Sequence, residues 1–305
     1  MKLAIFGAGN MGQGIAQCFA LAGHHVQLHD QSVAQAESAV ERIHASVKRR
    51  VEAGKQPARD LRLQAGGDVA EAELVIEAVF EDLAVKQALF SDLAKRTKAV
   101  LATNTSSFQV ADLAVHDRVV GLHFFFPAHV NRLVELVPGT ANEAAVSLAR
   151  NAVESVGKTV IVTKDSPGFA INRFLVPVLN EAARLVDAGH ALGDVEASGK
   201  AAFGMPLGPF SLMNASGTRV CAHAHETLHQ RAGCAPVAES LARLAPDNTP
   251  WDVAVGEISD ALVSHLQDCL RVQLAWIEKE NVASVDDLDL GARVGLGWSV
   301  APSTV

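Results

Sequence analysis

The sequence predicts an α/β fold in which a doubly wound sheet fills the first part of the chain and an all-α domain follows it. Three observations predict this. Short apolar runs alternate with helix-like segments through the first half. Three glycines follow the first apolar run at the spacing G-x-G-x-x-G. Beyond Pro167-Gly168 no segment has the pattern of a strand, and only helical patterns remain.

The predicted elements follow one another in a regular order. We expect helices over 9–23 and 83–96, and a long polar helix that continues through 52–55 and precedes a glycine-rich break at 64–68. A further helix is expected over 174–189, which Pro177 can kink. Strands are expected where short apolar runs stand between these segments: 2–6, 25–30, 72–79, 98–104, 118–125, 132–137 and 158–163.

The change of pattern predicts three segments: a nucleotide-binding domain over 1–164, a helical domain over 165–256 and a further helical segment over 257–305. The last segment carries a weak internal repeat, because 180–206 aligns with 273–299 at a constant offset of 93. Both stretches have the pattern helix, link, acid-x-acid, helix. A chance match of two helical periodicities is the alternative interpretation.

Composition excludes several classes of protein. A net charge of −8 opposes non-specific nucleic-acid binding, which needs a basic face. No apolar run reaches the length of a membrane span or of a signal peptide. The four cysteines are far apart and form no C-x-x-C, which is typical of reduced thiols in a cytoplasmic protein. His223, His225 and His229 lie on one predicted helix, but without a further ligand we predict no metal site.

The glycine motif has the context of a Rossmann-like dinucleotide site. It follows a strand, opens a helix and precedes an acid, Asp30, at the end of the next strand. Asp30 would accept hydrogen bonds from the adenosine ribose and repel a 2′-phosphate, and no cation follows it closely, which favours NAD over NADP. The predicted cofactor-binding residues of this motif are Gly7, Gly9, Asn10, Met11, Gly12 and Asp30.

His123 and Glu135 stand twelve residues apart across a segment broken by Pro127. Two strands joined by that segment would bring the two side chains together. A carboxylate behind an imidazole fixes its tautomer and makes it a proton acceptor near neutral pH, which the oxidation of an alcohol requires. A buried histidine with a chance partner is the alternative.

Several further motifs give the chain a resemblance to a known family. It resembles the L-3-hydroxyacyl-CoA dehydrogenases of fatty acid β-oxidation, in their monofunctional and multifunctional forms. The similarity covers most of the chain, in the family's order and spacing. The motifs that carry it are GAGNMGQGIAQCFALAGHHVQLHD, EAVFEDLAVKQALFSDL, ATNTSSF, GLHFFFPAHVNRLVELV, KDSPGFAINRFLVPVLNEAARLVDAG and FGMPLGPFSLMNASG.

This resemblance implies roles for individual residues. His123 is implied as the catalytic base and Glu135 as its orienting partner, with Ser106 and Asn172 as hydrogen-bond donors near the reacting oxygen and the substrate carbonyl. Positions beside the nicotinamide are implied for a second group of residues: Glu81, Lys86 and Asn104. The resemblance further implies an acyl-CoA substrate and a homodimer formed through the helical domain.

The substrate site is predicted from weaker signals. Contacts to the CoA phosphates are expected from a basic cluster, Lys48, Arg49, Arg50 and Lys55, although a solvated helix face is an equal alternative for each. Phe126 departs from the family, which usually has Asn or Ser there. Phe126 therefore predicts either a reshaped acyl pocket or impaired turnover.

The predicted function is the NAD-dependent interconversion of a 3-hydroxyacyl thioester and its 3-oxo form. Two alternatives stay open within enzymes: a hydroxyacyl group carried by a carrier protein, and a free hydroxy acid. A non-catalytic NAD-binding relative is the alternative from another class, favoured by Phe126 and opposed by the presence of Ser106, His123, Glu135 and Asn172.

Overall fold

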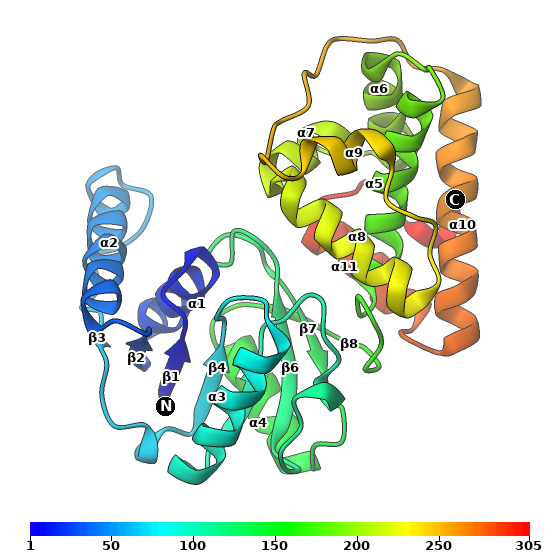
Figure 1. The fold of residues 1–305 in the computed structure, drawn as a ribbon. Helices are drawn as coiled ribbons and strands as arrows, with labels where there is room; N and C mark the ends of the chain where they lie inside the picture. The colour runs from blue at the N-terminus through cyan, green and yellow to red at the C-terminus, as the bar shows by residue number, and fades with distance from the viewer. The chain divides into compact units, whose positions relative to one another are not determined.

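The computed structural model describes residues 1–305, which form two compact units, Met1–Asp165 and Ser166–Val305. Figure 1 shows strands and helices in the first unit and helices alone in the second. The predicted fold class, a doubly wound sheet followed by an all-α domain, is confirmed. None of the helices combines the length and the apolar character needed to cross a bilayer.

The first unit is built on one sheet of eight strands in the order β3-β2-β1-β4-β5-β6-β7-β8. All neighbours run parallel except β6 and β7, which are antiparallel. The strand order reverses between β1 and β4, which is where ligands bind in open parallel sheets. The strands are β1 (Lys2–Phe6), β2 (His25–His29), β3 (Leu63–Ala65), β4 (Leu74–Glu77), β5 (Val100–Thr103), β6 (Val119–Phe124), β7 (Leu133–Val137) and β8 (Thr159–Val162).

The helices of the first unit begin at recognisable signals. Asp82 accepts a hydrogen bond from the Val85 N–H (3.0 Å) before α3, and Asn142 does the same for Ala145 (2.9 Å) before α4. These caps satisfy backbone donors that have no partner inside the helix. The helices of this unit are α1 (Asn10–Leu21), α2 (Val33–Glu52), α3 (Leu83–Arg96) and α4 (Glu143–Ser155).

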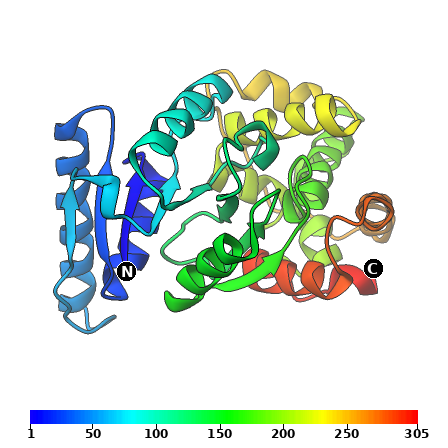
Figure 2. The same ribbon diagram turned by 90° about the horizontal axis from the view of Figure 1, so that it is seen from below.

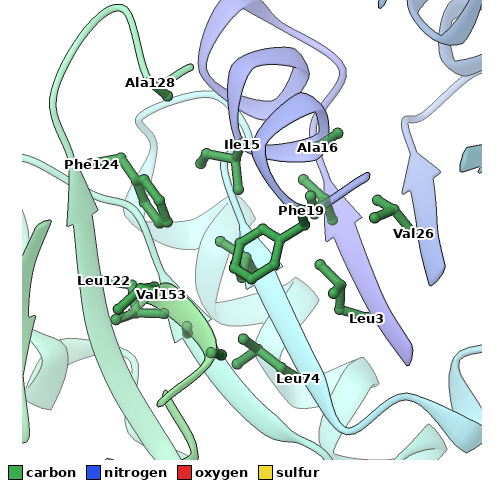
Figure 3. Packing of buried hydrophobic residues seen from close by; sticks show 14 of the residues in the cluster. Leu3, Ile15, Ala16, Phe19, Val26, Leu74, Leu122, Phe124, Ala128 and Val153 are labelled. Carbon is green, nitrogen blue, oxygen red and sulfur yellow. The ribbon is translucent and has the colours of Figure 1, made fainter. Parts of the chain in front are cut away.

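One continuous apolar core fixes α1, α2 and α4 against the sheet. Figure 3 shows Phe19 of α1 among residues of the neighbouring strands, with Val153 of α4 close by. On β6 the residues that face this core are Val120, Leu122 and Phe124. Because side chains alternate across a strand, His123, between Leu122 and Phe124, points to the opposite face of the sheet.

Two elements of the first unit, β3 and α4, differ from what the sequence predicted. The glycine-rich break at 64–68 overlaps a strand, since β3 pairs in parallel with β2. Three residues are too few to show alternation, so this edge strand had no readable pattern. The helix α4 was not predicted, although its Asn142 cap and apolar face are visible in the sequence.

The second unit contains only helices, as Figures 1 and 2 show. Pro177 lies inside α5, which the structure assigns as one helix from Ile171 to Asp187. The helices are α5 (Ile171–Asp187), α6 (Leu192–Phe203), α7 (Pro209–Ser216), α8 (Thr218–Ala232), α9 (Glu239–Leu244), α10 (Asp260–Glu280) and α11 (Val285–Gly291).

The helix ends of this unit repeat at one spacing. α5 and α10 end 93 residues apart, and α6 and α11 begin 93 residues apart. Gly204 and Gly297, again 93 residues apart, are both left-handed C-caps. These coincidences support the internal repeat, which stays a prediction, as does the separate segment over 257–305.

Candidate active site

The glycine turn between β1 and α1 has the shape that a dinucleotide needs. Gly7 has a φ of +106°, and a Cβ there would lie 2.3 Å from the Ala78 carbonyl oxygen. A Cβ on Gly12 would lie 1.8 Å from the Gly7 carbonyl oxygen. A Cβ on Gly9 would instead enter open space, with nothing within 4 Å. Gly7 and Gly12 are therefore required for packing within the protein. Gly9 leaves space for a ligand to reach the N-terminus of α1.

That helix N-terminus suits an anion. α1 begins at Asn10, has no side-chain cap and carries no acid in its first turn. Asp30 accepts hydrogen bonds from the Ala8 N–H (2.7 Å) and the Gln31 N–H (2.8 Å). These contacts fix the carboxylate beside the turn, where it can also accept from ribose hydroxyls. The residues present therefore fit NAD.

His123 and Glu135 are directly opposite each other on the antiparallel strands β6 and β7. Their side chains therefore leave the same face of the sheet. His123 Nδ1 lies 2.5 Å from Glu135 Oε2. His123 is 6% exposed and Glu135 is fully buried. The predicted meeting of the two side chains is confirmed. A carboxylate beside Nδ1 favours the imidazole tautomer that carries its proton on Nδ1.

The three phenylalanines after His123 have three different environments. Phe124 is buried in the core. The ring of Phe125 packs against the imidazole of His123, with 4.6 Å between centroids. Phe126 is 57% exposed and precedes Pro127 through a cis peptide bond. Only Phe126 is available to contact a ligand over most of its side chain.

The loop after β5 holds Ser106 and Asn104. Asn104 Oδ1 accepts from the Phe124 N–H (2.9 Å), so this loop is tied to the strand that carries His123. The backbone N–H of Ser106 donates to Glu81 (3.2 Å). Lys86 is 1% exposed, and its ammonium contacts acidic side chains. A place beside the nicotinamide stays a prediction for Glu81, Lys86 and Asn104.

A cavity of about 300 Å³ lies beside the start of α1. It is enclosed by α1, by α2 and by the segment that follows β6. Gly14 makes this arrangement possible, because its missing side chain lets Ala128 approach α1. The lining residues are Asn10, Gln13, Gly14, Gln17, Arg42, Ile43, Ser46, Phe126, Pro127 and His129.

None of the residues of the predicted basic cluster lines this cavity. Phe126, the other residue predicted to contact the substrate, does line it. Lys48 forms an exposed ion pair with Glu52 (3.9 Å), and Arg49 and Lys55 are exposed. Contacts of this cluster with the CoA phosphates stay a prediction. Arg42, Ser46 and His129, which were not predicted as site residues, line the cavity. Arg42 and Ser46 are four residues apart on a helix, and this spacing, read together with the cofactor motif, was the available signal.

A buried lysine fixes the segment between β6 and β7. The Lys158 ammonium donates to the carbonyl oxygens of Ala128 (2.5 Å) and Asn131 (2.6 Å). The Cys18 thiol donates to the same Ala128 oxygen (3.3 Å). Burial raises the pKa of the Cys18 thiol, although the nearby Lys158 opposes the shift. Burial also lowers the pKa of His129, and Arg50 and Lys158 lower it further.

Asn172 is the second residue of α5 in the second unit. Its assignment to the catalytic site stays a prediction from the sequence. Next to it, Arg173 is buried and pairs with Glu280 at the end of α10 (2.7 Å). Two of the three histidines on α8 bond to backbone carbonyls: His225 to Ala235 and His229 to Cys234.

Family models match the two units. Residues 2–166 match the NAD-binding domain of 3-hydroxyacyl-CoA dehydrogenase, and residues 168–248 match the C-terminal domain of the same family. NAD is therefore the cofactor of the first unit, in agreement with the Asp30 environment. Residues after 248 lie outside both matches.

Related proteins agree with this assignment. The chain is 34% identical over 248 residues to a probable 3-hydroxybutyryl-CoA dehydrogenase of Bacillus subtilis, covering 76% of this chain and 86% of the relative. The crystal structure of FadB2 from Mycobacterium tuberculosis is 33% identical, with a TM-score of 0.77, covering 84% of this chain and 98% of that one.

A further crystal structure shares the fold over the whole chain. It is 3-hydroxybutyryl-CoA dehydrogenase from Escherichia coli, with a TM-score of 0.87 over 100% of this chain and 90% of that one, at 24% identity. At that identity the likeness concerns the fold. The matched domains and the relatives together show that the chain belongs to the 3-hydroxyacyl-CoA dehydrogenase family.

Proposed function

We propose that the chain oxidises an L-3-hydroxyacyl thioester to the 3-oxoacyl thioester with NAD, and catalyses the reverse reaction. The observation that carries the proposal is the buried His123–Glu135 pair, with its 2.5 Å contact, in the unit that also carries the dinucleotide turn. An alcohol loses a proton and a hydride when it is oxidised. This unit provides for both, because NAD supplies the hydride acceptor when bound.

His123 takes the proton in this proposal. Glu135 holds the Nδ1–H, so Nε2 accepts the proton of the substrate hydroxyl, and the buried carboxylate stabilises the imidazolium that forms. In the reverse reaction the imidazolium returns the proton to the 3-oxo oxygen. Ser106 is proposed to donate a hydrogen bond to that oxygen, and Asn172 to hold the thioester carbonyl.

The cavity beside α1 supports a thioester with an anionic carrier. Arg42 supplies a permanent positive charge, Ser46 a hydroxyl and Phe126 an exposed apolar ring. These groups suit a chain that is apolar at one end and phosphorylated at the other. The names of the relatives favour CoA. A carrier-protein thioester and a free hydroxy acid are the alternatives. A free hydroxy acid carries no phosphate and would not need Arg42 and Ser46.

We further propose a homodimer formed through the second unit, and a cytoplasmic location. Val272 and Trp276 support the dimer, since both are about half exposed and share one face of α10. The wide spacing of the four cysteines supports the location. Sedimentation at several concentrations would test the dimer.

The test of the function is NADH oxidation with acetoacetyl-CoA, compared with acetoacetyl pantetheine and free acetoacetate. We expect turnover with the CoA ester. His123→Ala should lower kcat by about 10²- to 10⁴-fold, because the proton transfer loses its base. The affinity for NADH, followed by fluorescence, should stay within about twofold, since His123 is not part of the dinucleotide turn.

The same assay distinguishes the alternatives. Equal kcat/KM for the CoA ester and the pantetheine ester would favour a carrier protein over CoA. Turnover of acetoacetate alone would favour the hydroxy acid. NADH binding without turnover of any substrate would contradict the proposal and favour a non-catalytic NAD-binding protein.

A further inference from the structure

A buried ionic network lies at the ends of β4 and β5. Glu77, the last residue of β4, is fully buried. It accepts hydrogen bonds from the Lys86 ammonium (2.6 Å), the Thr103 hydroxyl (2.8 Å) and the Val79 N–H (2.7 Å). Lys86 comes from the first turn of α3 and is 1% exposed. Four backbone elements therefore meet at one carboxylate.

Lys86 connects this carboxylate to a second one. Its ammonium lies 3.0 Å from Glu81 Oε2. Burial would raise the pKa of Glu81, but the Lys86 ammonium and the hydrogen bonds from Thr105, Lys86 and the Ser106 N–H hold that pKa below its ordinary value. Glu81 is therefore ionised at neutral pH and is a strong acceptor.

Glu81 uses its other oxygen to hold the turn that contains Ser106. Glu81 Oε1 accepts from the Thr105 hydroxyl and from the backbone N–H groups of Ser106 (3.2 Å) and Ser107 (3.2 Å). The Thr105 hydroxyl oxygen accepts in turn from the Ser107 and Phe108 N–H groups, each at 3.1 Å. One carboxylate oxygen thus fixes the backbone on both sides of the Ser106 Cα.

We propose that Glu77, Lys86 and Glu81 form a positioning relay that sets the location of Ser106 in the reaction. The inference rests on the proposed function, in which Ser106 donates to the reacting oxygen. Glu77 orients Lys86, Lys86 orients Glu81, and Glu81 holds the Ser106 turn. Glu77 is thereby a positioning residue that acts at two removes from the substrate.

The geometry explains why a charged relay is placed here. The turn after β5 is irregular backbone, so its N–H groups have no strand partner and need acceptors. A neutral acceptor would hold them less strongly than an ionised carboxylate. The carboxylate in turn needs a buried cation, and a second acid completes the shell of Lys86. Asn104 ties the same loop to β6 through the Phe124 N–H, so Ser106 and His123 share one rigid frame.

The test uses Glu77→Gln and Glu81→Gln, which keep shape and remove charge. Lys86→Met would leave two buried carboxylates facing each other and is avoided. We expect each Gln variant to lower kcat about 10- to 100-fold, since small displacements of a positioned group have effects of that size. For Glu77→Gln the NADH Kd should stay within about twofold, because Glu77 is fully buried and is not among the predicted cofactor-binding residues. In a Ser106→Ala background, neither substitution should lower kcat further.

Asp82→Asn is the matched control, because Asp82 lies next to Glu81 but caps α3 at Val85 instead of holding the turn. It should leave kcat within about twofold. A second readout does not need turnover: amide hydrogen exchange at 105–108 should speed up in both Gln variants and not in Asp82→Asn. This readout stays valid if no thioester is turned over, so failure of the relay and failure of the proposed function can be told apart.

Three results would overturn the relay. The first is a kcat loss that adds fully to that of Ser106→Ala. The second is a rise of the NADH Kd of Glu77→Gln as large as its fall of kcat, which would tie Glu77 to cofactor binding and not to Ser106. The third is unchanged amide exchange at 105–108.

Discussion

Two buried polar groups serve the same end of the sheet in different ways. His123 and Glu135 are placed by strand register alone, since each is a residue of a regular strand and the two are paired across β6 and β7. Glu77, Lys86 and Glu81 come from a strand end, a helix and a loop. The first group handles a proton in the proposed reaction. The second holds irregular backbone.

The difference shows that a side chain on a loop needs more supporting residues than a side chain on a strand. A pair on adjacent strands needs no further support, because the ladder of backbone hydrogen bonds fixes both Cα atoms. A hydroxyl on a loop lacks that ladder, so side chains must replace it. The His123–Glu135 pair is therefore small, while the loop that holds Ser106 requires a larger set of residues.

The largest effect that would test this comparison is expected from Glu135→Gln. An amide can donate to Nδ1 as well as accept from it, which permits the wrong tautomer of His123. We expect kcat to fall by about 10²- to 10⁴-fold while the strand pairing persists. Steady-state kinetics and circular dichroism measure the two quantities.

The double variant with His123→Ala is the control. If Glu135 acts only through His123, the loss in the double variant should equal that of His123→Ala alone. A loss equal to the product of the two single losses would show that Glu135 has a function separate from His123. The two residues would then not act as one pair.

A smaller effect is expected from the glycine turn, where packing and binding separate. A Cβ on Gly9 meets nothing in the protein, so Gly9→Ala should fold normally and weaken NADH binding by about 10- to 100-fold, by obstructing the ligand. A Cβ on Gly12 would overlap the Gly7 carbonyl, so Gly12→Ala should also lower the thermal midpoint. Calorimetry and NADH titration distinguish them, and equal midpoints for the two variants would contradict this division.

The smallest effect concerns the pH dependence of stability. The pKa of Glu81 is lower in the folded protein than its ordinary value of 4.5, so its contribution is fully present above that pH and is lost as the pH falls through the folded pKa. We expect Glu81→Gln to lower the free energy of unfolding by about 1–3 kcal/mol at pH 7. The difference should shrink below about pH 4. Urea unfolding at pH 7 and pH 3.5 measures it, and a difference that does not change with pH would mean that the charge of Glu81 is not what holds the turn.

The two polar groups also differ in how far the sequence predicted them. The pairing of His123 with Glu135 followed from two short strand patterns and their separation. The burial of Lys86 between two acids could not be predicted from the sequence, because a lysine on a predicted amphipathic helix normally faces solvent. Its place beside the nicotinamide came from resemblance, and its contacts came from the structure.

The cavity beside α1 shows the same limit. Lys48, Arg49 and Lys55 formed the conspicuous basic cluster, yet Arg42 and Ser46 line the cavity. Charge density along the chain does not reveal which face of α2 is turned toward α1. That face is set by the apolar residues that α2 buries in the core, such as Ile43 and Val47.

The sequence by itself determined the fold class, the dinucleotide turn and the pairing of His123 with Glu135, because each depends on periodicity and short spacing that local backbone geometry enforces. Tertiary structure alone decided the environment of Lys86, the support of Ser106 and the lining of the cavity. These depend on contacts between elements far apart in the chain, and such contacts are selected by packing and by the cost of burying an unpaired charge.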